Sequence, residues 1–335
     1  MKNIGLDFYL LSDRISGSFD FFRNDITRLL GYASTSPLAI YETRPINGGH
    51  YYRRGWELMV DTKNLVGEFT WDTSLTFSKT NSFWKERLPN YDYQIYQQRE
   101  NEPMSAYYYY NVTGIINTDR SNMPESQKTL QAEAQLPGCP IIEDKNKDGK
   151  IDENDVYMKD NSPAIYVGIG NTFTYKRFEF SFFMYGQFGI QKYNIAYSAA
   201  QAGPLAVDYP ENSNKFAYRL WNSQTNPNGS RPGLAIGKMG ALPGNAWVNA
   251  DRENASFMRM RNITLAYNLA GNILGSLQRY VRNIKVYVDA QNPFILTKFQ
   301  GFDPEIYTGG GGASGGSRGE YPQTRTFSLG ANITF

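Results

Sequence analysis

The sequence predicts an all-β chain of about nine antiparallel strands that form part of a transmembrane β-barrel. Nine segments alternate apolar and polar residues with a period of two, the pattern of strands with one apolar and one polar face. Their connections alternate between short turns and long loops, as in outer-membrane barrels. Aromatic residues make up 15% of the chain and cluster near strand ends, as in the girdles at membrane interfaces.

The clearest predicted strand is GEFTWDTSLTFS, residues 67–78. Phe69, Trp71, Leu75 and Phe77 alternate there with acidic and hydroxyl side chains, so one face is apolar and the other polar. The other eight strands are predicted, in order, at residues 3–10, 14–22, 55–62, 164–175, 178–188, 256–269, 284–296 and 325–335.

The connections fall into two length classes. Short ones are predicted at residues 12–13, 63–66, 176–177 and 270–283, and long ones at about 27–53, 79–163, 189–255 and 297–323. A soluble sheet with one solvated face also alternates, but it has no reason to sort loop lengths by end. The loop asymmetry therefore favours a barrel, and a secreted soluble β-protein remains the alternative.

Composition excludes several function classes. The formal net charge is +2, so no strong basic field indicates a nucleic-acid partner. The one cysteine, Cys139, excludes an intrachain disulfide, and the one histidine, His50, argues against a histidine-based metal centre or a Ser-His triad. We expect no catalytic residues and no enzyme activity.

The segment EDKNKDGKIDENDV, residues 143–156, resembles a calcium-binding loop. Calcium takes six to eight oxygen ligands, with a glycine at the sharp bend of the loop, and Gly149 occupies that position. The predicted ligands are Asp144, Asn146, Asp148, the Lys150 carbonyl, Asp152 and Asp155. Asp155 stands where the pattern has Glu, which favours a modest calcium affinity, with magnesium as the weaker alternative. A solvated turn that binds no metal is the other interpretation.

Aromatic residues in or near the long loops are candidate substrate contacts, because aromatic faces stack on sugar rings and peptides. They are Tyr107, Tyr108, Tyr109, Tyr110, Trp84, Trp221 and Trp247. Ordinary packing within the loops is the alternative interpretation, and it is the commoner role of such residues.

Several motifs in series resemble the C-terminal barrel region of SusC/RagA-type TonB-linked outer-membrane transporters. They include EDKNKDGKIDENDV with NSPAIYVGIGNTFTYKRFEFSFFMYGQFG, then ASFMRMRNITLAYNL, KVYVDAQNPFILTKFQGFDPEI and YPQTRTFSLGANITF. The resemblance covers nearly the whole chain. It implies the last nine strands of a 22-stranded barrel in the outer membrane of a Gram-negative bacterium, with short periplasmic turns and long extracellular loops.

The resemblance also implies function and partners. Transporters of this type import glycans or peptides, work with a SusD-type surface lipoprotein, and draw energy from the TonB complex. A signal peptide, a plug domain and a TonB box are expected in the family but are not found in this sequence, so we expect residues 1–335 to be a partial barrel. The second hypothesis is a secreted, calcium-stabilised soluble β-protein that binds glycans.

The barrel interpretation assigns faces to the strands. Lipid contacts the face of Leu75 and Phe77, and the lumen the face of Ser74 and Thr76. By alternation from Ile263, Arg259 and Arg261 are predicted on the outer face, where they would pair with lipopolysaccharide phosphates or form ordinary salt bridges. Phe335, at the end of an amphipathic strand, resembles the signal that the barrel-insertion machinery reads.

Overall fold

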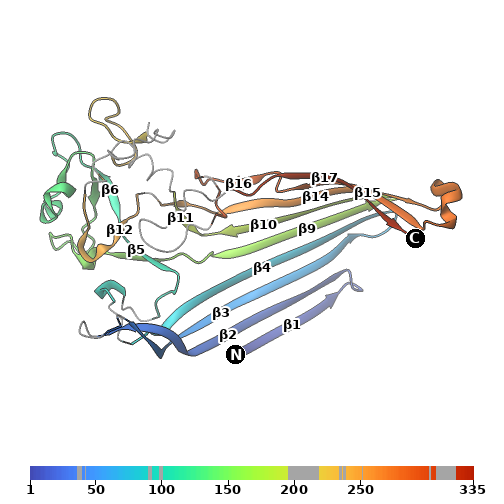
Figure 1. Ribbon diagram of the computed structural model, residues 1–335, viewed down its shortest axis with the longest axis horizontal. Helices are drawn as coiled ribbons and strands as arrows, with labels where there is room; N and C mark the ends of the chain where they lie inside the picture. Colours follow the sequence, from blue (N-terminus) through green and yellow to red (C-terminus); the bar gives the residue numbers. More distant parts are fainter. Residues whose placement is uncertain are drawn as a thin grey trace.

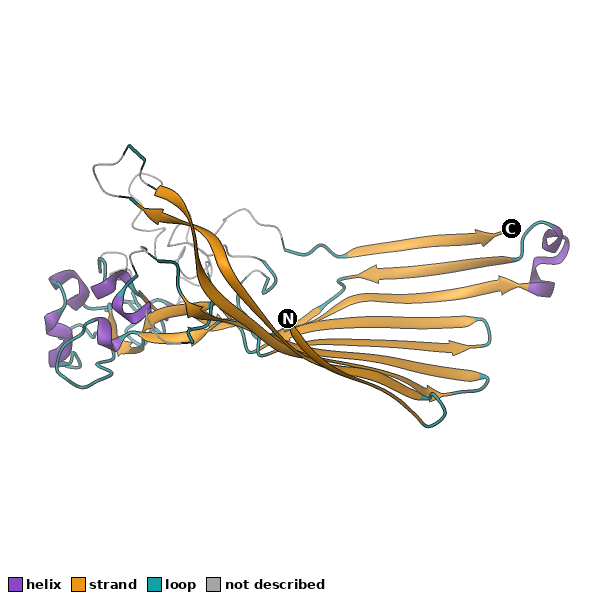
Figure 2. Ribbon diagram, turned by 90° about the horizontal axis from the view of Figure 1, so that it is seen from below, coloured by secondary structure: helices purple, strands orange, loops and turns teal. Residues whose placement is uncertain are grey.

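The computed structural model describes residues 1–35, 40–41, 43–89, 93–97, 101–194, 219–233, 236, 239–250, 252–301, 303–306 and 322–335. Long strands run side by side from a set of turns at one end to a group of loops at the other (Figure 1). The same twisted sheet is seen from below in Figure 2.

One antiparallel sheet contains the nine predicted strands in sequence order, which confirms the all-β prediction. The strands are β1 (Lys2–Leu10), β2 (Ile15–Ser34), β3 (Thr43–Leu65), β4 (Phe69–Glu86), β9 (Ile165–Tyr175), β10 (Phe178–Phe188), β14 (Phe257–Ala270), β15 (Asn283–Gln291) and β17 (Thr326–Thr334). A short strand, β16 (Ile295–Thr297), follows β15 and also pairs with β14. Each strand pairs with its neighbours in the chain order, so the sheet needs no crossover.

The register gives the sheet one polar and one apolar face. Ser74 lies opposite Asp61 and Gly170, whereas Leu75 lies opposite Val60 and Ile169. We call the face of Ser74 the inner face, because two hollows are lined by its polar side chains. The face of Leu75 is the outer face. It leaves large apolar side chains exposed, such as Leu329 at 78%, as expected of a surface that contacts lipid.

The turn end of the outer face carries a cluster of aromatic rings. Phe173 lies at its centre, with ring centroids 5.6 Å from Trp71, 5.9 Å from Phe180 and 6.4 Å from Phe182. The turns beside it are short, apart from the 3-10 helix η9 (Gly271–Arg279) between β14 and β15. This arrangement matches the interfacial aromatic girdle that the sequence predicts near strand ends.

The predicted long loop at residues 27–53 is wrong. β2 and β3 continue as a paired hairpin from Thr27 opposite His50 to Ser34 opposite Thr43. A strand of about 9 to 11 residues crosses the apolar band, and β2 and β3 have 20 and 23 residues, so the hairpin extends beyond it. Outside lipid neither face has to be apolar, which is why the alternation that predicts strands fades there. β4 likewise continues to Glu86, into the predicted loop 79–163.

The other long connections form a second structural unit, which we call the loop cap: the described residues between β4 and β9 and between β10 and β14. Its strands are β5 (Ala106–Tyr110), β6 (Val112–Ile115), β7 (Pro140–Ile142), β8 (Tyr157–Asp160), β11 (Gln191–Tyr193), β12 (Trp247–Val248) and β13 (Arg252–Asn254). Its 3-10 helices are η1 (Ile95–Gln97), η2 (Glu125–Thr129), η3 (Ala132–Gln135), η4 (Glu153–Asp155) and η8 (Pro243–Asn245).

The loop cap has a hydrophobic core of its own. Tyr110, Ile116 and Cys139 of the first long connection are fully buried in it, and Met239 and Leu242 of the second are also part of this core. The single O–H of Tyr110 is shared between the carbonyl oxygens of Asp152 (2.9 Å) and Pro243 (3.0 Å). Two segments far apart in the sequence are therefore held together at one side chain.

Phe335, the predicted insertion signal, follows β17 and is exposed.

Candidate functional site

A hollow of about 660 Å³ lies on the inner face where the sheet meets the loop cap. Hydroxyl side chains of β4 form one wall, charged and aromatic side chains of β3, β9 and β10 form another, and loop-cap residues such as Ser105 and Ser162 complete it. The lining includes Tyr51, Arg53, Glu57, Thr76, Ser78, Thr80, Ser82, Ser105, Tyr166 and Tyr185. Such a mixture of hydrogen-bonding groups and tyrosine rings suits a polar ligand with ring or peptide faces.

Trp84, a predicted contact residue, adjoins this hollow. Its ring meets the ring of Tyr51 edge-on, with centroids 6.1 Å apart. The Arg87 guanidinium lies over the same indole at 5.6 Å and forms an ion pair with the fully buried Glu102 at 2.6 Å. Because a buried carboxylate needs a charged partner, this ion pair fixes Arg87 and thereby the position of the Trp84 ring.

The four consecutive tyrosines divide between two environments. Tyr108 and Tyr110 pack on the core of the loop cap, as the alternative of ordinary packing predicted. Tyr107 and Tyr109 point the other way: the Tyr107 ring stacks on Tyr109, with centroids 5.2 Å apart, and the Tyr109 ring stacks on Tyr157, with centroids 5.7 Å apart. We call these three the tyrosine row. The Arg252 guanidinium lies 3.8 Å over the Tyr107 ring, and burial lowers the pKa of Arg252 and raises the pKa of the Tyr107 hydroxyl.

The remaining candidate aromatics do not join the row as a single site. Trp221 packs against the backbone at Gly138, where an added Cβ would lie 2.8 Å from the indole, so its role is packing. The backbone of Trp247 pairs with Tyr109, but its side chain lies outside the described residues. The structure thus brings Trp84 to the hollow and Tyr107 and Tyr109 to a separate row.

Two carboxylates of the predicted calcium loop accept hydrogen bonds from the backbone of the same loop. The fully buried Asp155 accepts hydrogen bonds from the backbone N–H groups of Lys145 (2.9 Å) and Asp152 (2.8 Å). The Asp152 side chain in turn accepts from Asn154 N–H (2.8 Å), so both residues form a capping box on η4. Asp152 and Asp155 are therefore engaged in holding the loop.

The first half of that loop has the hydrogen bonds of a metal-binding turn. Asp144 Oδ2 accepts from Gly149 N–H and Asp148 Oδ1 accepts from Lys150 N–H, both at 2.9 Å. Asp144 Oδ1 is buried and accepts no hydrogen bond, which is the one feature here that fits a ligand of a cation. Over the described residues, no three His, Cys, Asp or Glu side chains converge as a metal cluster. The oxygen atoms of this loop are the kind of ligand that calcium takes, but the carboxylates are not arranged around one point.

The prediction that Arg259 and Arg261 face outward is wrong. Phe183 pairs with Asn262 and Met184 with Met260, so Arg261 is an extra residue in a β-bulge. One inserted residue exchanges the faces of the strand beyond it. Arg259 therefore lies opposite Tyr185 on the inner face and is only 3% exposed.

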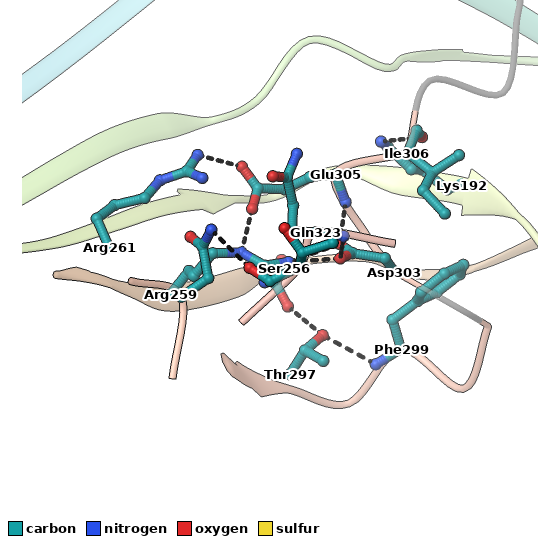
Figure 3. Close-up of polar contacts among 12 residues, drawn as sticks. Lys192, Ser256, Arg259, Arg261, Thr297, Phe299, Asp303, Glu305, Ile306 and Gln323 are labelled. Atoms are coloured by element: carbon teal, nitrogen blue, oxygen red, sulfur yellow. Dashed lines mark hydrogen bonds and ion pairs between the residues drawn. The ribbon is translucent and has the colours of Figure 1, made fainter. Parts of the chain in front are cut away.

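Arg259 is the centre of a buried ion-pair network with the connection between β16 and β17 (Figure 3). Its Nη2 donates to both oxygens of Asp303, at 2.7 and 2.8 Å, and its Nε donates to Glu305, which also pairs with Arg261. Asp303 further accepts from the backbone N–H of Gln323 at 3.2 Å. The network attaches this connection to the inner face of β14. It was missed from the sequence, where the signal is two arginines at alternate positions of a strand and two acids flanking Pro304.

Comparisons of sequence agree with this architecture. No family model matches the chain. It is 26% identical over 353 residues to TonB-dependent receptor P3 of Formosa agariphila, and 27% identical over 342 residues to TonB-dependent receptor SusC of Bacteroides thetaiotaomicron. Both alignments cover 99% of this chain and 34% and 31% of those receptors. The chain thus spans about a third of the length of the curated relatives that it matches.

Solved structures show the same fold. A structure of the RagAB peptide transporter superposes with a TM-score of 0.73 at 20% identity, and RagAB in its closed-closed state with 0.72 at 18%. Each covers 99% of this chain and about a third of the matched chain. Among the described residues, no helix is long and apolar enough to cross a membrane. The sheet has the fold of part of a β-barrel of the Gram-negative outer membrane, and over 99% of its length the chain is similar to SusC/RagA-type TonB-dependent receptors.

Proposed function

We propose that this chain forms the wall and the extracellular cap of an importer that carries oligosaccharides or peptides across the outer membrane. The observation that supports this most strongly is the polar hollow on the inner face directly below the loop cap. Arg53 and Glu57 offer charges of both signs there, and Tyr51, Tyr166 and Tyr185 offer ring faces. A substrate that passes along the inner face would contact these groups in turn.

The proposed partners follow from the likeness to SusC and to RagAB. We propose a SusD-like surface lipoprotein that closes over the loop cap, and the TonB complex as the source of energy on the periplasmic side. The tyrosine row, with Arg252 over Tyr107, is the part of the cap that we assign to contact with the substrate or with this lipoprotein. A secreted soluble protein would not leave Phe327, Leu329 and Ile333 exposed side by side on one strand.

We also propose that the loop at residues 144–155 binds calcium through Asp144, Asn146, Asp148 and the Lys150 carbonyl, with Asp152 and Asp155 as the residues that hold the loop. The support is the buried Asp144 Oδ1, which accepts no hydrogen bond. When bound, calcium would stiffen the segment that leads from the loop cap into β9. It would have a structural role, since no described feature of the loop sets up catalysis.

The experiment that tests the import proposal compares two tyrosines of β9 on opposite faces. Tyr166 lines the hollow, whereas Tyr175 lies on the outer face at the turn end. Tyr166→Ala and Tyr175→Ala are introduced at the chromosomal locus, beside a deletion of the gene, and uptake of labelled oligosaccharide and peptide pools is measured. We expect the deletion and Tyr166→Ala to reduce uptake of one pool at equal protein level, with Tyr175→Ala near wild type. Unchanged uptake of both pools in the deletion strain would overturn the proposal.

A further inference from the structure

A row of cations crosses four neighbouring strands, β1 to β4, on the outer face. Lys2 lies opposite Arg23, and Arg23 lies opposite Arg54. Lys79 on β4 is close to this row, opposite Trp56, two residues from Arg54 along β3. We call Lys2, Arg23, Arg54 and Lys79 the cation row.

The cation row belongs to the lipid-facing side of the sheet. Phe21 and Trp56 lie opposite one another and are two residues nearer the turns than Arg23 and Arg54, so they share their face. Aromatic rings of the same face also hold the guanidinium groups. Arg23 lies 4.4 Å over the ring of Tyr52, and Arg54 lies 5.1 Å over the ring of Phe83.

The row stands at the height of the outer membrane interface. A strand crosses the apolar band in about 9 to 11 residues. Arg23 lies 8 positions from the turn end of β2 at Ile15. Arg54 lies 11 positions from the turn end of β3 at Leu65, and Lys79 lies 10 positions from the turn end of β4 at Phe69. Because outer-membrane barrels have their short turns on the periplasmic side, these cations are placed at the level of the outer-leaflet head groups.

The row is not neutralised by the protein. Like charges opposite one another across a sheet repel, and the row has two such pairs. In the part of the chain that the structure describes, the one ion pair of the row joins Arg23 to Asp25, at 3.0 Å. His50 Nε2 lies 3.4 Å from the same carboxylate. The positive charge of Lys2, Arg54 and Lys79 is thus left for a ligand from outside the chain.

We propose that the cation row binds the phosphate groups of outer-leaflet lipids. Guanidinium groups bind phosphate through paired hydrogen bonds, and an ammonium group adds a mobile point charge. Acyl chains below the phosphate would lie on the outer-face side chains of Phe21, Trp56 and Phe77. One lipid would therefore contact the cation row with its phosphate and the apolar face with its acyl chains. The site is distinct from Arg259 and Arg261, which are engaged with Asp303 and Glu305 on the inner side. It does not depend on the import proposal, only on the membrane location.

The test uses two adjacent arginines that face opposite ways. The double variant Arg54→Gln/Lys79→Gln removes two cations of the row, and Arg53→Gln removes a cation of the inner face beside it. Each protein, expressed from its own gene and purified in neutral detergent, is titrated with lipid A, with dephosphorylated lipid A and with inorganic phosphate. Binding is read from the shift in unfolding temperature and from bound lipid in native mass spectrometry.

We expect lipid A to bind wild type and Arg53→Gln alike, and the double variant about tenfold to thirtyfold more weakly, as the loss of two interfacial cations implies. Dephosphorylated lipid A should not distinguish the three proteins. The proposal is overturned if the double variant binds lipid A as wild type does. It is also overturned if inorganic phosphate alone reproduces the full effect, since the row would then be a free-anion site, or if neither probe binds wild type, which would leave an acidic protein partner as the occupant.

Discussion

Arg259 donates two hydrogen bonds from Nη2 to the carboxylate of Asp303, at 2.7 and 2.8 Å, and the two side chains are 4% and 6% exposed. The pair joins β14 to a connection more than forty positions later in the chain. Glu305 and Arg261 extend it to a network of four charges. Since Arg259 and Asp303 are buried, each depends on its partner for solvation.

Removal of one partner of this pair should therefore be costly. We expect Asp303→Asn to destabilise the protein by about 3–5 kcal/mol, because it removes one of the two carboxylates that pair with the buried Arg259 guanidinium. The double variant Arg259→Met/Asp303→Leu should cost clearly less than the sum of its two single variants. Thermal unfolding followed by tryptophan fluorescence in detergent measures all of these. Additive losses would show that the two residues do not act as a pair.

The Tyr110 hydroxyl should contribute to the stability of the loop cap. Tyr110→Phe leaves the carbonyl oxygens of Asp152 and Pro243 without their donor, at a cost of about 1–3 kcal/mol. Tyr280→Phe, at a turn residue that is 68% exposed, is the matched control and should be neutral. Hydrogen exchange of the cap amides, measured by mass spectrometry, reports the difference. Equal exchange in both variants would contradict the assigned role.

Cys139 should be unreactive while the loop cap is folded. Burial raises the pKa of its thiol to about 11, and the thiolate is the reactive form. We expect labelling by a thiol reagent at pH 8 to be at least about a hundredfold slower than in denaturant. Because the folded pKa is raised, the thiol favours the folded cap below the ordinary pKa near 9, and this contribution is lost as the pH rises from about 9 to about 11. Rapid labelling of the folded protein at pH 8 would mean that the cap opens.

Substitutions in the calcium loop should have different effects at residues that bind calcium and at residues that hold the loop. Asp148→Asn should weaken calcium binding, read by isothermal titration, and leave the calcium-free protein as stable as before. Asp155→Asn should lower the unfolding temperature even in a chelator, because Asp155 accepts from backbone N–H groups of Lys145 and Asp152. If calcium does not bind wild type, the loop is a metal-free turn.

The strands were predictable where lipid imposes a pattern. Leu75 and Phe77 alternate with Ser74 and Thr76 because one face contacts lipid and the other water, and β4 follows from that alone. Beyond the membrane this constraint ends. The part of the β2–β3 hairpin from the pair Thr27–His50 to the pair Ser34–Thr43 therefore shows no such alternation. The core of the loop cap was also hidden, because it is assembled from short segments of two connections that meet only in three dimensions.

The candidate site was predictable in part for a similar reason. Tyr107 to Tyr110 could be identified as candidates, and alternation then divides them between the core and the tyrosine row. The face of Arg259 could not be predicted from spacing, because the bulge at Arg261 depends on pairing with Phe183 and Met184. Asp303 and Glu305 carried no periodic signal, since they lie in an irregular connection.

The most direct test of the account is the face assignment of β4 in a bilayer. Single cysteines at positions 74 to 78, in a Cys139→Ala background, are labelled with an environment-sensitive fluorophore, and the protein is reconstituted into vesicles of brominated lipid. Strong quenching at positions 75 and 77 and weak quenching at 74, 76 and 78 is the predicted result. Uniform quenching, or none at any position, would contradict the conclusion that this sheet is a barrel wall with its polar inner face turned away from lipid.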